Sequence, residues 1–366
     1  MTNMKKLVAM MLMLASVFFF ACEDDDPDPL SPEKAKAELN ELSAQMSTDL
    51  ADMQETEGMI AMKSLMNMTD PFSDSKSGLR TAVIPNIYES IIPFSKEINS
   101  KLTYEVDSFD FDTYKGTYTW NNNAQLWEIT LGGNTIIINF PSNEANMGVN
   151  DAKLTISNYQ EDANYNPTAI AAKLEINEIV YVEITFSATW TEDEPTILQV
   201  SIYLKPFTFS GGFEQTSSTA SVNFSIVYEN TRLLNTSLSI TFTDTTKEEI
   251  KKIVGYIQYR DIKISAAINL ANIMEIRQSL ADESSPYTTM DELISALNKE
   301  IDAKITKNGA LVATIKLAMT DQGITVVLKF SDGSTEPAQP FFEVFISNLE
   351  DLFGFIKDYF SDEGTV

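Results

Sequence analysis

Residues 180–190 read VYVEITFSATW. Apolar side chains occupy every second position from Val180 to Trp190, and Tyr, Glu, Thr and Ser stand between them. Because successive side chains of a β-strand point to opposite faces, this period of two predicts a strand with one buried and one solvated face. Strands of this kind are typical of antiparallel sheets, which can face water on one side.

The same period of two extends from this strand in both directions along the chain. The alternating runs are Leu102–Val106, Tyr118–Trp120, Trp127–Leu131, Ile136–Phe140, Ala152–Ile156, Leu198–Leu204, Val222–Tyr228, Leu238–Phe242, Ile262–Leu270, Leu311–Leu317 and Ile324–Phe330. Asn308-Gly309, between two apolar runs, is typical of a tight β-hairpin. The pattern predicts a large, curved antiparallel meander that could close into a barrel-like form.

Helical spacing precedes and follows the meander. Ser31-Pro32-Glu33 supplies an N-cap, a proline at the first helical position and an early acid. Apolar residues then recur at steps of three and four over Leu39–Met53, and Gly58 is expected to break this helix. Further helices are expected near residues 247–258, 289–301 and 341–360. The sequence therefore predicts an α+β fold, with an N-terminal helical segment and a C-terminal helix packed on the sheet.

The N-terminus divides into two short segments before this body. Residues 1–21 combine Lys5 and Lys6 with a short apolar run, which is the layout of a signal peptide. The run is shorter than the roughly 20 apolar residues that a membrane-spanning helix needs. Residues 22–31 form an acidic tether, residues 32–100 the helical segment, and residues 101–366 the β-rich body.

The junction of the first two segments carries a resemblance. Phe19-Phe20-Ala21-Cys22 resembles a bacterial lipobox, and Cys22 is the only cysteine in the chain. The acidic run that follows resembles the surface-export signal of Bacteroidota lipoproteins; it consists of Glu23, Asp24, Asp25 and Asp26. The resemblance implies acylation of Cys22 and a lipid-anchored protein of the outer membrane that faces the cell exterior. It covers only the first 26 residues and implies nothing about the body.

Composition limits the chemistry. The formal net charge is −27, which disfavours binding to nucleic acid. The chain has no histidine, which excludes Ser-His-Asp and Cys-His catalysis and imidazole-ligated metal sites. Carboxylate acid–base chemistry, tyrosine or lysine chemistry, oxygen-ligand metals, or a function without catalysis remain open.

One acidic group is a candidate site. Asp107, Asp110 and Asp112 lie close together in a segment with strand-like alternation. Asp110 and Asp112 would share a face about 7 Å apart, which suits a calcium site or the carboxylate pair of a glycosidase. A solvated strand face accounts for the same pattern.

Aromatic residues form a second candidate site. Tyr118, Trp120 and Trp127 stand close together in the meander, around a turn at Asn121–Asn123. Exposed rings would stack on a glycan or another ligand, whereas buried rings would simply belong to the core. A third possibility is a cavity under the sheet for a hydrophobic ligand, with the methionine-rich N-terminal helix as its lid.

The expected function is therefore a non-enzymatic binding or interaction module without a cofactor, held at the membrane by its lipid anchor. A glycan, an envelope protein or a hydrophobic small molecule is the expected partner. Two alternatives stay open: a carrier of a lipid or other hydrophobic ligand, and a carboxylate-based glycoside hydrolase.

Overall fold

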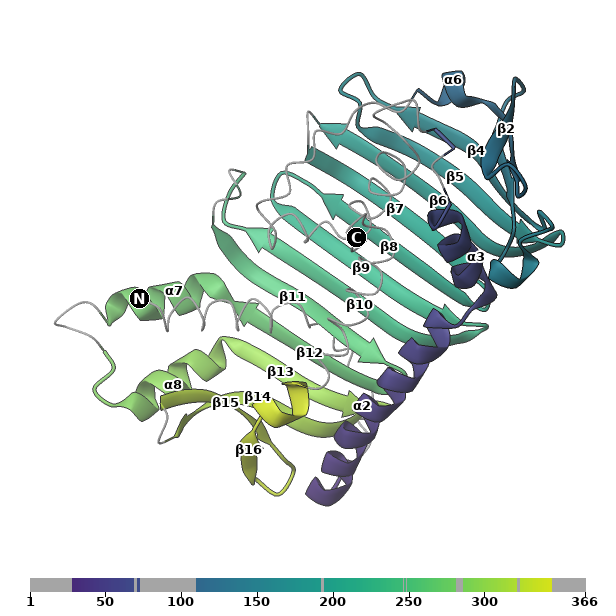
Figure 1. Ribbon diagram of the computed structural model, residues 1–366. Helices are drawn as coiled ribbons and strands as arrows, with labels where there is room; N and C mark the ends of the chain where they lie inside the picture. The colour runs from purple at the N-terminus through teal and green to yellow at the C-terminus, as the bar shows by residue number, and fades with distance from the viewer. Residues whose placement is uncertain are drawn as a thin grey trace. The chain divides into compact units, whose positions relative to one another are not determined.

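The computed structural model describes residues 28–68, 71–72, 110–191, 194–245, 247, 249–280, 286–320 and 323–343 (Figure 1). Its strands follow the order β16-β15-β14-β13-β12-β11-β10-β9-β8-β7-β6-β5-β4-β3-β1-β2, so the order is open, with β16 and β2 at its ends. The predicted α+β fold with a large, mostly antiparallel sheet is confirmed. The chain divides into two compact units: unit 1 comprises residues 1–48, 215–225 and 232–349, and unit 2 comprises residues 49–214, 226–231 and 350–366.

Unit 2 contains the alternating run at residues 180–190, which lies in β6. Its strands are β1 (Gly116–Asn121), β2 (Leu126–Leu131), β3 (Ile136–Phe140), β4 (Ala152–Glu161), β5 (Pro167–Ile176), β6 (Ile179–Thr191), β7 (Glu194–Leu204) and β8 (Phe207–Gln215). Val182, Ile184 and Phe186 on β6 are buried, as the alternation predicts. Consecutive strands from β3 to β8 pair antiparallel with one another.

The start of this sheet departs from a simple meander. β2 pairs antiparallel with one side of β1, and the chain then returns to the other side, where β3 pairs parallel with β1. Gly116 begins β1 with φ at +156°. A Cβ there would lie 2.5 Å from the carbonyl oxygen of Thr130. Glycine therefore permits the close approach of β1 and β2 at this end of their pairing.

Helix α3 (Glu57–Met66) of unit 2 packs on β6 and β7 through its first turn. Thr56 is its N-cap, and the Thr56 hydroxyl accepts a hydrogen bond from the N–H of Met59. Gly58 does not break a helix, contrary to expectation, because it lies inside α3. A Cβ on Gly58 would come within 2.9 Å of side-chain atoms of Val182 and Leu204. Glycine at this position allows α3 to approach β6 and β7 closely.

Unit 1 contains the remaining strands, except for the last residues of β9 (Ile226–Tyr228) and the first residue of β10 (Thr231), which belong to unit 2. The remaining strands are β9 (Thr219–Tyr228), β10 (Thr231–Phe242), β11 (Ile250–Tyr259), β12 (Ile262–Asn269), β13 (Ile301–Lys307), β14 (Ala310–Thr320), β15 (Gly323–Lys329) and β16 (Thr335–Pro337). Asn308 and Gly309 both have positive φ, at 49° and 86°, so the predicted hairpin between β13 and β14 is confirmed.

The prediction of a helix at residues 247–258 is wrong, because residues 250–259 form strand β11. Ile250, Ile253 and Ile257 recur at steps compatible with a helix, but Ile253 and Ile257 also share one strand face, and both are buried. Pairing with β10 and β12 on both sides decides between the two periods. The β-branched residues of the segment favour the same result.

Helices of unit 1 include the first part of α2 (Pro32–Gln54), α7 (Leu270–Ser279) and α8 (Met290–Lys299). Ala35, Leu39, Leu42 and Met46 of α2 are buried, and the N–H of Leu30 donates to the carbonyl oxygen of Leu311 at 2.9 Å. The Ser331 hydroxyl donates to the carbonyl oxygen of Leu30 at 2.8 Å. The start of α2 is thus fixed to β14 and to the turn after β15.

The two helices predicted near residues 289–301 and 341–360 have different outcomes. α8 matches the helix predicted near residues 289–301 and begins with a capping box between Thr289 and Glu292. Residues 339–343 are helical, and the rest of the helix predicted at 341–360 lies outside the described residues. Among the helices of the described residues, none is both long enough and apolar enough to span a membrane.

Candidate functional site

The edge strand β2 of unit 2 exposes apolar side chains on both faces. Leu126 is 49% exposed, Ile129 is 51% exposed and Leu131 is 66% exposed. Leu126 lies on one face of the strand, and Ile129 and Leu131 lie on the other. Single exposed apolar residues are common, but a contiguous apolar edge strand is a template for pairing with another chain.

The core face of the sheet continues onto β2, and no described residue buries the side chains of Ile129 and Leu131 there. Ile129 pairs with Tyr118, and Leu131 pairs with Gly116. Both β1 residues are buried, whereas their β2 partners are more than half exposed. A strand added beyond β2 would therefore extend this apolar face by one more row of side chains.

The backbone of β2 presents hydrogen-bonding groups on its outer side. The N–H of Gly132 donates to the carbonyl oxygen of Lys115 at 2.8 Å. Because paired groups alternate along antiparallel strands, the even-numbered residues of β2 continue this ladder toward β1. The N–H and C=O groups of Ile129 and Leu131 point the other way. Among the described strands, β2 pairs only with β1.

The three aromatic residues predicted to contact a glycan or ligand lie at this corner. Tyr118 and Trp120 are 2% and 5% exposed, so the core covers their rings, and Trp127 on β2 is half-buried. The Tyr118 hydroxyl donates to the carbonyl oxygen of Tyr114 at 2.9 Å. Burial raises the pKa of Tyr118 to about 12, and Tyr114 adds to the effect. Contact with a ligand stays a prediction for all three residues.

The tryptophan pair includes an unsatisfied donor. The rings of Trp120 and Trp127 lie 5.1 Å apart at 65°, in an edge-to-face arrangement. The buried Nε1 of Trp120 has no hydrogen-bond acceptor within the described part of the chain. Buried polar groups are normally hydrogen-bonded, so this corner of unit 2 holds an unpaired donor next to the exposed apolar edge.

The edge strand of unit 1 differs from β2. β16 has only 3 residues, and it ends at Pro337, which has no N–H to donate. Glu336 on β16 forms an ion pair with Lys36 of α2. A short strand, a proline and a paired charge are the usual protections of a sheet edge. The longer apolar strand β2 carries none of them except the single charge of Glu128.

The predicted acidic site has a different local structure from the one expected. Residues 111–114 form the short helix α6 (Phe111–Tyr114) and not a strand, because the Asp110 side chain caps its first N–H groups. Hydrogen bonds from Thr113 lower the pKa of Asp110, and Asp112 pairs with Lys115. Asp107 lies outside the described residues. Within the described residues, no three acidic side chains are placed to hold a metal ion.

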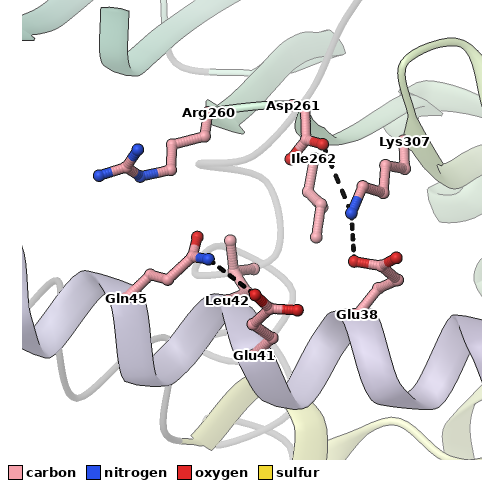
Figure 2. Close-up of a pocket in the computed structure, with 8 residues that line it drawn as sticks. All are labelled: Glu38, Glu41, Leu42, Gln45, Arg260, Asp261, Ile262 and Lys307. Carbon is pink, nitrogen blue, oxygen red and sulfur yellow. Dashed lines mark hydrogen bonds and ion pairs between the residues drawn. The ribbon is translucent and has the colours of Figure 1, made fainter.

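A polar pocket of about 270 Å³ lies in unit 1, between α2 and two hairpin turns (Figure 2). Its lining residues are Glu38, Glu41, Leu42, Gln45, Arg260, Asp261, Ile262 and Lys307. Lys307 points between two carboxylates: it pairs with Glu38 and lies 3.4 Å from Asp261. The Gln45 amide donates to Glu41 at 3.0 Å.

The charges of this pocket largely satisfy one another. Hydrogen bonding to Glu38 and the charge of Asp261 raise the pKa of Lys307. The Asp261 carbonyl also accepts from the N–H of Asn308 at 3.0 Å, which ties the two turns together. These contacts join α2 to the sheet, so the pocket is a weaker candidate for binding than the edge of β2.

The sequence predicted the exposed apolar edge of β2 only in part. The alternation of Trp127, Ile129 and Leu131 predicted the strand, but period alone does not show that its apolar face is uncovered. Leu126, apolar on the opposite face, was the available hint of an exposed edge. Cys22 and the acidic run Glu23–Asp26 lie outside the described residues.

Comparisons with known proteins give little guidance. No protein-family model matches the chain. No curated protein matches it either. The crystal structure of a porin-like protein from Bacteroides vulgatus is similar over 50% of this chain and 90% of that one, with 9% sequence identity and a TM-score of 0.20. A TM-score this low supports no conclusion about fold or function.

Proposed function

We propose that the protein is a lipid-anchored binding module of the outer-membrane surface, and that it binds an extended segment of a partner protein as a strand added to β2. The exposed apolar edge of β2 is the observation that carries this proposal. Strand addition uses backbone hydrogen bonds for affinity and alternate side chains for specificity. It requires no catalytic group, in keeping with a chain that has no histidine.

The residues of β2 define the chemistry of the partner. Apolar side chains at alternate positions of the added strand would pack beside Ile129 and Leu131. Glu128, the charged residue of β2, and the net charge of −27 favour basic residues on the other face of the added strand. The same net charge disfavours a second copy of this chain as the occupant.

The geometry favours a protein partner over the alternatives. A glycan stacked at the aromatic corner of unit 2 needs open ring faces, and the rings of Tyr118 and Trp120 are covered. The glycosidase alternative relied on Asp110 and Asp112, which here contact Thr113 and Lys115. The carrier alternative needs a large apolar cavity, whereas the pocket described above is small and polar.

A short synthetic strand tests the edge directly. A labelled peptide of about seven residues that alternates lysine and valine should bind the protein in fluorescence anisotropy. Ile129→Pro removes an outward N–H without disturbing the ladder to β1, so it should abolish peptide binding. Ile129→Ala keeps that N–H and is the matched control, with only partial loss expected.

Three outcomes contradict the proposal for β2. They are equal binding by Ile129→Pro and wild type, equal binding of a peptide that alternates glutamate and valine, and a wild-type dimer that dissociates in Ile129→Pro. Thermal unfolding of each variant shows whether a loss of binding reflects a loss of folding.

The lipid anchor has a separate test. Cys22→Ala in the full-length chain should move the protein from the membrane fraction to the soluble fraction of an envelope preparation, because its only acylation site is lost. A variant with asparagine in place of Glu23, Asp24, Asp25 and Asp26 should keep the anchor. It should no longer be digested by protease added to intact cells, because it is no longer exported to the cell surface. A membrane-bound Cys22→Ala variant contradicts the anchoring proposal.

A further inference from the structure

One face of the unit 1 sheet carries several lysines and almost no acid. The strand pairings place one set of side chains of β11 to β15 on the face opposite to most of the buried core residues. Ser265 and Val327 of this set are themselves buried. The lysines of this set, here named the lysine face, are Lys252, Lys263, Lys304, Lys316 and Lys329. Among the described residues of these strands, Asp302 is the single acid on that face.

The register brings the lysines together. Paired residues form a row across five strands: Tyr256, Ser265, Lys304, Thr314 and Lys329. Since neighbouring strands lie about 4.8 Å apart, the backbones at Lys304 and Lys329 are about 10 Å apart. Lys263 and Lys316 stand two residues from this row, on opposite sides of it, on β12 and β14.

The contacts of the lysine face differ from those of lysines elsewhere in the chain: Lys316 donates a hydrogen bond to the carbonyl oxygen of Ile301 at 3.4 Å, and Lys263 lies over the Tyr256 ring. Lys153, Lys173 and Lys307 form ion pairs. Within the described part of the chain, Lys304 and Lys329 form none. The chain has 53 acidic residues against 26 basic ones, so an acid within reach of each lysine is the expected arrangement. The lysine face is therefore a local exception in an acidic protein.

Contacts on the face show uncompensated positive charge. The Nζ of Lys263 lies 4.4 Å from the centre of the Tyr256 ring, and the Tyr256 hydroxyl accepts from the Asn235 amide at 2.8 Å. Burial, with a contribution from the charge of Lys304, lowers the pKa of Lys263. A bound anion between Lys263 and Lys304 would relieve this repulsion.

We infer that the lysine face binds a polyanionic polysaccharide, with Lys263, Lys304, Lys316 and Lys329 contacting its carboxylate or sulfate groups. The hydroxyls of Thr306 and Thr314 lie among these lysines and can hydrogen-bond to sugar hydroxyls. This site is in unit 1 and is independent of strand addition at β2 in unit 2.

A single polysaccharide chain fits the charge distribution better than a broad anionic surface. A membrane surface extends well beyond the lysine face and would also meet the acidic remainder of the protein. Because salt screens charges over about 10 Å at 0.1 M, a narrow chain on the face experiences mainly the nearby lysines. Nucleic acid carries a high charge density that the net charge of −27 repels over longer distances.

Dextran sulfate, with neutral dextran as its control, tests the inference in the full mature chain. Isothermal titration calorimetry in about 0.05 M salt should show binding of dextran sulfate alone, and binding should weaken as salt is raised. The double variant Lys304→Gln, Lys329→Gln should bind roughly tenfold more weakly, as expected for two lost exposed ion pairs. Lys34→Gln removes an exposed lysine of α2 and should leave binding unchanged.

Four results would overturn the inference: equal binding of dextran, no effect of the double variant, an equal loss in Lys34→Gln, or tighter binding of oligothymidylate or phosphatidylglycerol vesicles than of dextran sulfate. If the double variant does not fold, the single variant of the exposed Lys329 replaces it. Binding of the lysine–valine peptide at β2 should be the same in all these variants, so the two sites can fail separately.

Discussion

A single residue decides whether the first two strands of unit 2 can pair closely. Gly116 combines a φ of +156° with a backbone oxygen only 2.5 Å from where a Cβ would be. Ser142 is a buried polar residue whose side chain is stabilised by a partner. Its hydroxyl and its N–H each donate a hydrogen bond to the Asp151 carboxylate at 2.8 Å. The first case depends on the absence of a side chain, and the second depends on its partner.

Gly116→Ala should lower the free energy of unfolding by about 2–4 kcal/mol, since the new methyl group collides with backbone that cannot move freely. Urea unfolding followed by circular dichroism measures this change. Gly148→Ala is the matched control, because the space around Gly148 is open, and it should change stability by less than about 0.5 kcal/mol. Equal stability of the two variants contradicts the steric account.

Glu175 gives unit 2 a stability that depends on pH. It accepts from Lys153 at 2.8 Å and from Lys173 at 2.9 Å, and these contacts lower its pKa below the ordinary 4.5. In the unfolded chain the carboxyl regains its ordinary pKa and takes up a proton first as the pH falls. The stabilisation by Glu175 is therefore complete above about pH 5 and is lost as the pH falls through its lowered pKa.

Glu175→Gln should reduce stability at pH 7 by about 0.5–1 kcal/mol, the range of partly exposed ion pairs, and should match wild type at pH 2–3. Urea midpoints measured across this pH range report the difference. Glu144→Gln, at an exposed position, should follow wild type throughout. A difference for Glu175→Gln that persists unchanged at low pH argues for a packing effect instead.

At the scale of elements, α3 shows how a helix can depend on a missing side chain. Alanine is about 1 kcal/mol better than glycine within a helix, so propensity alone predicts that Gly58→Ala stabilises the protein. The contacts at 2.9 Å with Val182 and Leu204 predict the opposite, a net loss of about 1–2 kcal/mol. Thermal unfolding distinguishes the signs, and Ile60→Ala on the exposed side of α3 is the control.

Strand prediction succeeded where the period of two had a single interpretation. The run at 180–190 matches β6, and Asn308-Gly309 matches the turn between β13 and β14. It failed at residues 247–258, where Ile250, Ile253 and Ile257 fit a helix as well as a strand. The deciding information was the pairing of β11 with two neighbours, which no local pattern contains.

The candidate site was predictable only in part for the same reason. Sequence drew attention to Tyr118, Trp120 and Trp127, and these residues do lie together at one corner. It did not show which of them would be buried, because burial depends on β3 returning to the far side of β1. That return leaves β2 at the edge, and the edge is the feature on which the proposed function rests.

At the scale of the whole molecule, the charge balance should govern the response to salt. A net charge of −27 destabilises the compact state through self-repulsion. Raising sodium chloride from about 0.01 M to 0.15 M shortens the screening length from about 30 Å to 8 Å and should raise the urea midpoint. Potassium chloride should act equally, which separates screening from binding of sodium. A midpoint that falls with salt indicates that attractive ion pairs dominate.

The hydrogen bonds of Leu30 to Leu311 and Ser331 limit how far unit 1 can lie from an anchor at Cys22. In a protein acylated at Cys22, Leu30 is eight residues further along the chain than the anchored residue. A chain extends by at most about 3.5 Å per residue, so Leu30 stays within about 28 Å of the bilayer surface. With that anchor, the turn that contains Ser331 would be held within reach of the lipid headgroups, and a partner approaching this end of unit 1 would have to fit the narrow space above the membrane.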